Sequence, residues 1–327
     1  MKIFNKIYNL ILGLTLFATI TVNAQDATRL PAALFTEIQM DARAAAMGGT
    51  SNITQSSSFG VFSNASANLF AKERLNVGTA LSAPAYFSGN KLFSLGSYYN
   101  LNENHGVSFG VRYYNYPTIN ILDIDGAGSE KFAPKEMTAD LGYGYKINDQ
   151  LAVSVTGRYI HSNMGSFEEA KPAQGFAADM GITYITDLHE IEGASLAFAL
   201  TANNFGTQLK YLDEAIALPS SINFGSSVDM PFTADHQLSL TLHAGYRVLP
   251  TYFKGATAGI GAEYNLFKHG FLRAGYHFSD SEKGLGNFTT WGGGIQFHPV
   301  KVDIAFWTGV PNQEFKSTLF INLGIAL

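Results

Sequence analysis

The feature that most constrains the fold is a two-residue alternation of apolar and polar side chains, repeated in many separate segments. Residues 150–162 show it clearly, because one face carries Leu151, Val153, Val155 and Tyr159, and the other carries Ala152, Ser154, Thr156 and Arg158. A period of two is the period of a β-strand. One face of each such segment is apolar throughout. The sequence therefore predicts an all-β protein whose sheet has one apolar surface.

The whole chain divides into about fourteen such segments of roughly ten residues, the length that a tilted strand needs to cross a bilayer. An even number of strands is typical of bacterial β-barrels, and so are short periplasmic turns that alternate with longer outer loops. The short and long gaps here alternate in that way. We therefore expect a transmembrane antiparallel up-and-down β-barrel with both chain ends on the periplasmic side and strands at 73–82, 90–100, 105–115, 136–146, 150–161, 175–186, 194–203, 220–229, 236–247, 254–266, 270–279, 289–298, 300–309 and 316–327.

The composition agrees with a membrane barrel. Charged residues make up 14% of the chain, whereas they are about a quarter of an ordinary soluble domain. Glycine, phenylalanine and tyrosine are abundant, at 33, 25 and 16 residues. The 26 acidic residues exceed the 21 basic ones, so nucleic acid is not an expected partner, since it would need a basic surface. Outer-membrane lipid is the expected surrounding.

The first 24 residues have the pattern of a signal peptide. Lys2 and Lys6 precede the apolar stretch 10–20, and small residues end the segment at Ala24. We expect residues 1–24 to be removed on export, and the mature protein to lie in the bacterial outer membrane. The chain contains no cysteine, which excludes a lipoprotein anchor, disulfides and thiol catalysis.

The last segment alternates up to the final residue, with Leu319, Ile321, Leu323, Ile325 and Leu327 on one face. This pattern resembles the C-terminal strand signature that the barrel-assembly machinery recognises, although such strands usually end in Phe. The barrel-assembly machinery is therefore an expected partner.

Charged residues fall on the faces opposite the aliphatic ones. We expect these faces to line the lumen, because a charged side chain at the bilayer midplane costs about 2–4 kcal/mol. Buried charges need partners, so we interpret them as structural pairs, with a dedicated ligand site as the alternative. The expected luminal charges are Arg112, Asp140, Arg158, Asp179, Arg247, Glu263, Arg273 and Asp303, together with Lys301, His243 and His277.

Residues 25–72 precede the first strand and are too many for a simple linker. We expect them to form a plug, and residues 73–327 to form the barrel. Within the plug, Asp41–Met47 is predicted to be a short helix, with Gly48 and Gly49 as a hinge. The plug also contains four charged residues that could pair with luminal charges: Arg29, Glu37, Asp41 and Arg43. We expect the segment to lie in or across the periplasmic mouth.

Glycine within a strand often marks a place where another backbone approaches. Such glycines, on the luminal faces of the predicted strands, are Gly142, Gly144, Gly259, Gly261, Gly292 and Gly294. The plug is the backbone that we expect there.

Two motifs in this segment carry a family likeness. The first is the run ARAAAMGG at 42–49, which contains Arg43, Met47, Gly48 and Gly49. The second is SFGVFSNASANL at 58–69, in which Asn64 is followed by Ala65 where the family has proline. Together with the barrel, these motifs resemble the PorV/PorQ family, a branch of the FadL-like outer-membrane barrels.

The resemblance implies a non-enzymatic accessory or cargo-handling component of type IX protein secretion, with secreted cargo proteins and other secretion-system components as partners. Other FadL-like barrels carry hydrophobic compounds across the outer membrane, which is the alternative function. The sequence itself contains no catalytic constellation, and its eight histidines never take metal-ligand spacing. We therefore expect no enzymatic activity, cofactor or metal ion.

Overall fold

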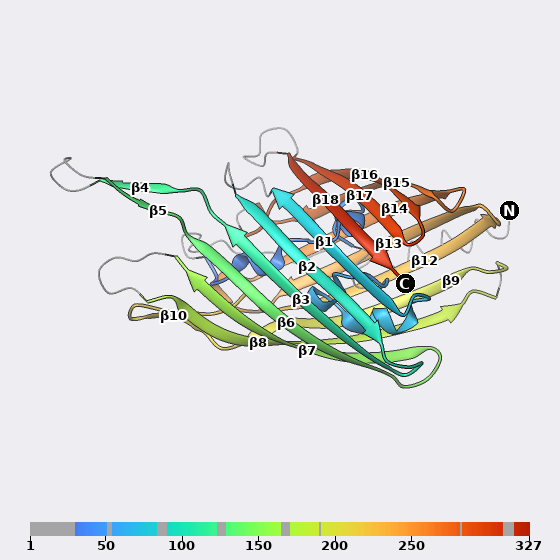
Figure 1. Cartoon of the computed structure of the whole chain (residues 1–327), viewed down its shortest axis with the longest axis horizontal. Helices are drawn as coiled ribbons and strands as arrows, with labels where there is room; N and C mark the ends of the chain where they lie inside the picture. Colours follow the sequence, from blue (N-terminus) through green and yellow to red (C-terminus); the bar gives the residue numbers. More distant parts are fainter. Residues whose placement is uncertain are drawn as a thin grey trace.

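The computed structural model describes residues 30–50, 54–83, 90–122, 129–164, 171–189, 191–281, 283–309 and 317–327. The expected signal peptide at 1–24, and Arg29, lie outside these residues. Fourteen strands form one closed antiparallel barrel (Figure 1). This confirms the predicted fold class, and each predicted span overlaps one observed strand. The strands are β1 Leu75–Ala83, β2 Lys91–Asn100, β3 His105–Asn115, β6 Lys135–Lys146, β7 Leu151–Asn163, β8 Ala173–Asp187, β9 Ser195–Gly206, β12 Ser221–Thr233, β13 His236–Arg247, β14 Gly255–Leu266, β15 Gly270–Ser279, β16 Phe288–Phe297, β17 Val300–Gly309 and β18 Thr318–Ala326.

The barrel closes where the first strand pairs with the last. β1 and β18 are antiparallel, with Asn76 opposite Ala326, and the backbone N–H of Leu75 donates to the carbonyl of Leu327 at 2.9 Å. The short turns lie at this end of the barrel, which we therefore call the periplasmic end, and the longer connections lie at the other end, the outer end. The first strand therefore begins, and the last strand ends, at the periplasmic end.

Two small hairpins occupy the long outer connections. β4 (Ile119–Leu122) pairs with β5 (Ser129–Phe132), and β10 (Leu209–Tyr211) pairs with β11 (Glu214–Ile216). The β4–β5 hairpin extends well beyond the barrel, at the left of Figure 1. Sequence reasoning treated both regions as plain loops, because ladders of three or four residues are too short for alternation to be visible.

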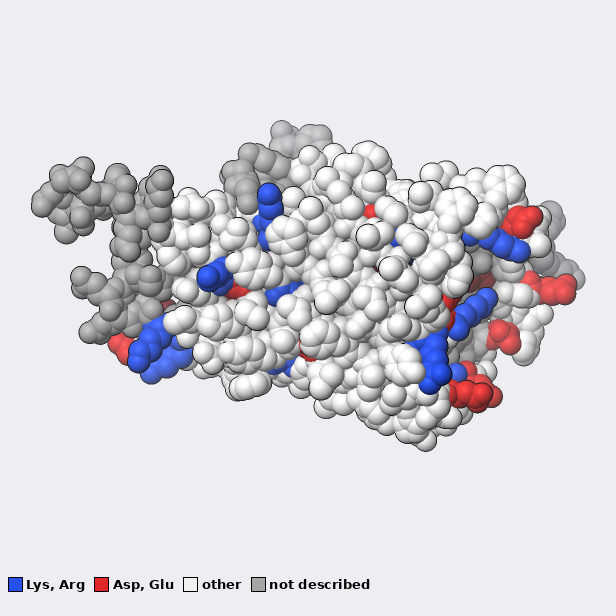
Figure 2. All heavy atoms as spheres, viewed as in Figure 1, with Lys and Arg blue, Asp and Glu red and all other residues white. Residues whose placement is uncertain are grey.

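The outer face of the barrel is an apolar belt. Large aliphatic and aromatic side chains point outward there, such as Leu141, which is 67% exposed, and Phe176, which is 64% exposed. In the space-filling view the middle of the molecule is mostly free of charge, and charged residues gather toward the two ends (Figure 2). Such a belt matches the hydrocarbon layer of a bilayer. No helix in the described part of the chain has both the length and the apolar character needed to cross a membrane.

The described residues before β1 lie inside the barrel, within its outline in Figure 1. They contain the 3₁₀ helix η2 (Leu34–Glu37), the helix α2 (Ala42–Ala45), and the 3₁₀ helices η4 (Gly60–Phe62) and η5 (Ala65–Phe70). The 3₁₀ helix η5 packs on β6, β7 and β8. We call the described residues from 30 to 74 the plug.

The plug does not begin at the periplasmic mouth. Its first residues lie in the outer half of the lumen, where the N–H of Ala32 donates to Ala217 O in the outer connection after β11 at 3.0 Å. The chain then descends to β1, so the alanine-rich helix lies deeper in the barrel than we expected. The sequence gives no signal for this depth, since nothing local distinguishes one level of a barrel wall from another.

Candidate functional site: the plug and the outer luminal cavity

The helix α2 ends in a hinge of two glycines. Asp41 caps the helix, because its carboxylate accepts a hydrogen bond from the N–H of Arg43 at 2.8 Å. The structure gives Asp41 this capping role in place of the expected ion pair. Gly48 and Gly49 have φ of 71° and 75°, a conformation that strongly favours glycine. The N–H of Gly49 returns to the carbonyl of Ala44 at 2.9 Å, which reverses the chain.

The hinge fits against a part of the wall that has no side chains. Gly261 lies so close to the plug that an added Cβ would be 2.5 Å from the carbonyl oxygen of Met47. A Cβ on Gly259 would likewise be 2.5 Å from the carbonyl oxygen of Gly48. In the other direction, a Cβ on Gly48 would lie 2.6 Å from the carbonyl oxygen of Tyr276. Glycine is needed on both sides of this contact.

The remaining luminal glycines differ from one another. A Cβ added to Gly292 would lie 2.7 Å from the Cβ of Ala46 in the plug. Gly142 and Gly144 have side chains of the plug within 4 Å, from Ala65 and Leu69. Gly294 faces the carboxylate of Asp303 in the wall, so the expectation of a nearby plug backbone is wrong at that position.

A chain of ion pairs joins the plug to the wall. The guanidinium of Arg43 binds both carboxylate oxygens of Glu263, at 2.8 and 2.6 Å. Glu263 also accepts from Arg273 at 2.5 Å, and Arg273 donates to Asp303 at 2.6 Å. Burial acts to lower the pKa of Arg43, but the Glu263 carboxylate outweighs it and the pKa is raised above its ordinary value. A bidentate pair of this kind fixes orientation as well as charge.

A second group of charges belongs to the wall. Arg158 donates to Asp140 at 2.5 Å and to Asp179 at 2.7 Å, and it also contacts Asn204. Arg112 is fully buried, lies 3.7 Å from Asp140 and donates to the plug carbonyl of Thr36 at 2.9 Å. A third contact joins Arg247 to Glu37 of the plug, with distances of 2.9 and 2.5 Å.

All eight proposed luminal charges are thus buried, and the structure divides them among these three groups.

Sequence reasoning missed Glu136, which is 2% exposed in β6 and accepts a hydrogen bond from Tyr116 at 2.6 Å. The alternation that places Asp140 in the lumen also places Glu136 there, so the pattern contained the signal. Burial and the nearby Glu136 carboxylate raise the pKa of Tyr116 above its ordinary range.

Asn64 caps η5 in the periplasmic half of the plug. Its side-chain oxygen accepts from the N–H of Ser66 at 3.1 Å, and its amide donates to Thr183 of β8 at 2.8 Å. The side chain is 2% exposed. It therefore stabilises the plug internally and joins it to the wall.

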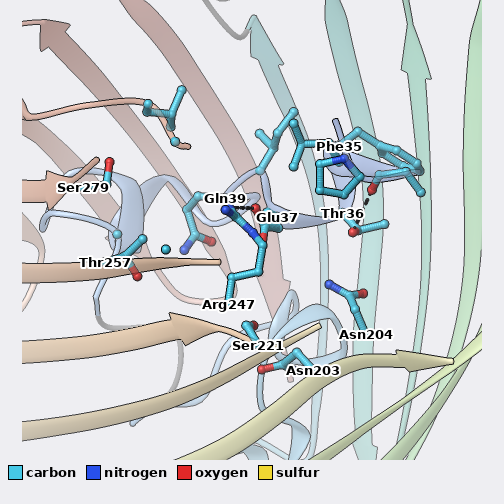
Figure 3. Close-up of a pocket in the computed structure, with 18 of the residues that line it drawn as sticks. Phe35, Thr36, Glu37, Gln39, Asn203, Asn204, Ser221, Arg247, Thr257 and Ser279 are labelled. Atoms are coloured by element: carbon cyan, nitrogen blue, oxygen red, sulfur yellow. Dashed lines mark hydrogen bonds and ion pairs between the residues drawn. The ribbon is translucent and has the colours of Figure 1, made fainter. Parts of the chain in front are cut away.

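The outer half of the lumen contains a cavity of about 850 Å³. Residues 30–40 of the plug form part of its lining, and no residue of 64–74 takes part. The pair Glu37–Arg247 lies at its centre, with Asn203, Asn204 and Ser221 on one side (Figure 3).

Much of the remaining wall of the cavity is aromatic. Phe288 stacks on Trp307, and Phe320 packs against the same indole at a tilt of 50°, each with ring centroids 4.5 Å apart. The Trp307 indole N–H donates to the carbonyl of Ala45 at 2.8 Å.

A space with this lining is suited to an apolar molecule. Among the described residues, no three histidine, aspartate or glutamate side chains come together as ligands for a metal ion.

A fourteen-stranded barrel with an apolar belt and an internal N-terminal plug is an outer-membrane β-barrel protein. Its fold is similar to that of the Pseudomonas putida toluene transporter TodX, with 14% identity, a TM-score of 0.58, and coverage of 87% of this chain and 96% of that one. The Ralstonia pickettii toluene transporter TbuX has 12% identity, a TM-score of 0.56, and coverage of 89% and 98%. No curated protein matches the chain.

The family described as type IX secretion system protein PorV matches residues 22–254. The chain belongs to the PorV family. This confirms the likeness carried by the plug motifs, and the protein is an outer-membrane barrel associated with type IX secretion.

Proposed function

We propose that the protein is a non-enzymatic accessory of type IX secretion that receives secreted proteins and passes them to the machinery that attaches them to the cell surface. Membership of the PorV family over residues 22–254 carries this proposal. The plugged lumen supports it as well. Arg43 and Glu37 hold the plug to the wall by ion pairs. In this proposal, cargo proteins therefore bind the outer surface of the barrel and do not pass through its lumen.

Among the described outer elements, the β4–β5 hairpin projects far from the barrel and is available for such contacts (Figure 1). Its base is closed by a hydrogen bond of 3.1 Å from the N–H of Tyr116 to the carbonyl of Pro134. It forms its own two-stranded sheet, separate from the barrel. The hairpin can therefore be shortened without removing a barrel strand.

The test compares the tagged protein with a variant in which residues 118–132 are replaced by a short Gly-Ser linker. Both are purified from detergent-solubilised outer membranes. We expect secretion-system components and secreted proteins to co-purify with the parent and to be depleted from the variant. A matched control replaces the periplasmic turn at 101–104. If nothing from the secretion system co-purifies with the parent, and deletion of the gene leaves the secreted proteins unchanged, the proposal fails.

A second candidate function is the passage of hydrophobic compounds across the outer membrane. The aromatic outer cavity favours it, and the fold relatives TodX and TbuX are toluene transporters. Uptake of radiolabelled aromatic compounds by cells with and without the gene tests this candidate. Equal uptake by both strains would count against it.

The two ends of the chain are proposed to direct export and assembly into the outer membrane. We propose cleavage of residues 1–24, so that the mature protein begins at Gln25, which N-terminal sequencing of the purified protein checks. We also propose that the barrel-assembly machinery recognises β18, whose outward face carries Leu319, Ile321, Leu323 and Ile325. Replacing Ile325 and Leu327 by serine is expected to reduce the amount of assembled barrel, whereas serine at the inward-facing Gly324 serves as the control.

A further inference from the structure

Two histidines lie at the same level of the outer cavity. His243 in β13 is opposite Gly259 in β14, and Gly259 is opposite His277 in β15. Successive residues of a strand alternate between faces, so these three neighbours share the luminal face. Both imidazoles are part of the cavity lining. Gly259 leaves a gap between them, which the plug hinge occupies.

The hinge engages one histidine of the two. Nδ1 of His277 lies 3.1 Å from the carbonyl oxygen of Gly48, and its ring stacks on Phe288. Nδ1 of His243 is buried and has no hydrogen-bond partner among the described residues. Leaving a buried polar atom without a partner costs roughly 1–3 kcal/mol. Such an atom beside a cavity indicates where a ligand group would bind.

The buried charged groups of the lining already have partners, and Glu136, for instance, accepts a hydrogen bond from Tyr116 at 2.6 Å. Arg112 Nη2 is the second buried lining atom without a hydrogen bond among the described residues, but it lies 3.7 Å from an oxygen of Asp140. Glu37 and Arg247 neutralise each other. Lys283 is at the outer rim, in the connection between β15 and β16, and is partly exposed. The interior of the cavity therefore offers an uncharged hydrogen-bonding position at His243 within aromatic walls.

We infer that the cavity binds a mostly apolar compound that carries one neutral hydrogen-bonding group, such as a hydroxyl, and that His243 receives this group. The inference rests on the second candidate function, namely that the cavity holds hydrophobic compounds. The inference excludes a carboxylate as the preferred polar group of the ligand. A carboxylate buried beside His243 would have no unpaired cation next to it, and burying an unpaired charge is costly. Lys283 is the position that an anionic ligand would use instead.

The chain provides its own reporter for a test. Of its two tryptophans, Trp307 is in the cavity wall, whereas Trp291 is on the lipid face and 52% exposed. In a Trp291→Phe background, fluorescence therefore reports on the cavity alone. The purified protein in lipid nanodiscs is titrated at neutral pH with three probes of similar size: 1-naphthol, naphthalene and 1-naphthoate.

We expect 1-naphthol to quench Trp307 with a dissociation constant about three- to tenfold lower than that of naphthalene, as one added hydrogen bond allows. We expect 1-naphthoate to bind most weakly. His243→Leu should remove the preference for naphthol and leave naphthalene binding, whereas His243→Gln should retain part of the preference. The matched control is His105→Leu, which alters a partly exposed histidine of β3 that packs against Tyr145 and is not part of the cavity lining.

Two results would overturn the inference. If His243→Leu leaves the ratio of naphthol to naphthalene affinity unchanged, or if naphthoate binds best, His243 does not receive a neutral group. If no probe quenches Trp307, the cavity is not a site for such compounds, and the second candidate function fails with it. Neither result bears on the secretion role, which the co-purification experiment measures separately.

Discussion

Gly48 and Gly49 provide a matched pair of substitutions at the plug hinge. Both have positive φ, so an alanine at either position costs roughly 1–2 kcal/mol in backbone conformation. At Gly49 the nearest atom to an added Cβ is Nδ1 of His277 at 3.8 Å, which is ordinary contact. At Gly48 the added Cβ would meet the carbonyl oxygens of Tyr276 and Ile260 at 2.6 and 2.7 Å.

Both of these oxygens belong to ladder backbone in the wall, which cannot rotate away as a side chain can. Forcing an extra carbon into a well-packed site costs typically about 1–3 kcal/mol. Gly48→Ala should therefore destabilise the seated plug by about 1–3 kcal/mol more than Gly49→Ala, since the conformational cost is common to both.

Hydrogen–deuterium exchange with mass spectrometry measures this difference on peptides that cover residues 40–50. The N–H groups of Ala45, Ala46 and Met47 are bonded within the helix, so their exchange reports opening of the plug. Exchange in Gly48→Ala should be about five- to hundredfold faster than in Gly49→Ala. Peptides from β7 serve as the control for an intact barrel. Equal exchange in the two variants would refute the glycine-contact argument.

Three further substitutions test the charge network, the cap and the lipid face. Glu263→Gln removes the charge that Arg43 and Arg273 share, and should cost about 3–5 kcal/mol in urea unfolding; an unchanged midpoint would show that the network is not stabilising. Asn64→Ala should cost about 1 kcal/mol by loss of the η5 cap, measured as faster exchange over residues 64–70, while Ser56→Ala, at an exposed position of the plug, should change little. Leu141→Arg on the lipid face should lower barrel stability by about 2–4 kcal/mol; a loss no larger than that for arginine in the turn at 147–150 would contradict the membrane placement.

The fold was accessible from sequence because the barrel wall is built from a local rule. Along β7, for example, the alternation assigns Val155 outward and Arg158 inward without knowledge of any neighbour. The same rule fixed the number of barrel strands and separated short from long connections. It failed for the β10–β11 hairpin, whose three-residue strands carry too little alternation to be distinguished from a loop.

The candidate site was accessible in part. Sequence reasoning selected Arg43 and Glu263 as charges that need partners, but it did not pair them, because they are 220 residues apart in the chain. It also placed the plug at the periplasmic mouth, whereas the structure places residues 30–40 against the outer cavity. Neither result follows from local sequence, since depth and pairing depend on which strands lie opposite the plug.

The sequence alone determined which residues face lipid and which face the lumen, because the hydrocarbon layer penalises charge at every strand independently. It also identified the Gly48–Gly49 hinge, since few residues other than glycine adopt its backbone conformation. The tertiary structure alone decided that the hinge fits the bare wall at Gly259 and Gly261 and that an aromatic cavity remains above it. It also decided that His243 lines this cavity with its Nδ1 unpartnered among the residues the structure describes. These features arise from the stagger of strands distant in sequence, which closure of the barrel fixes and no single segment encodes.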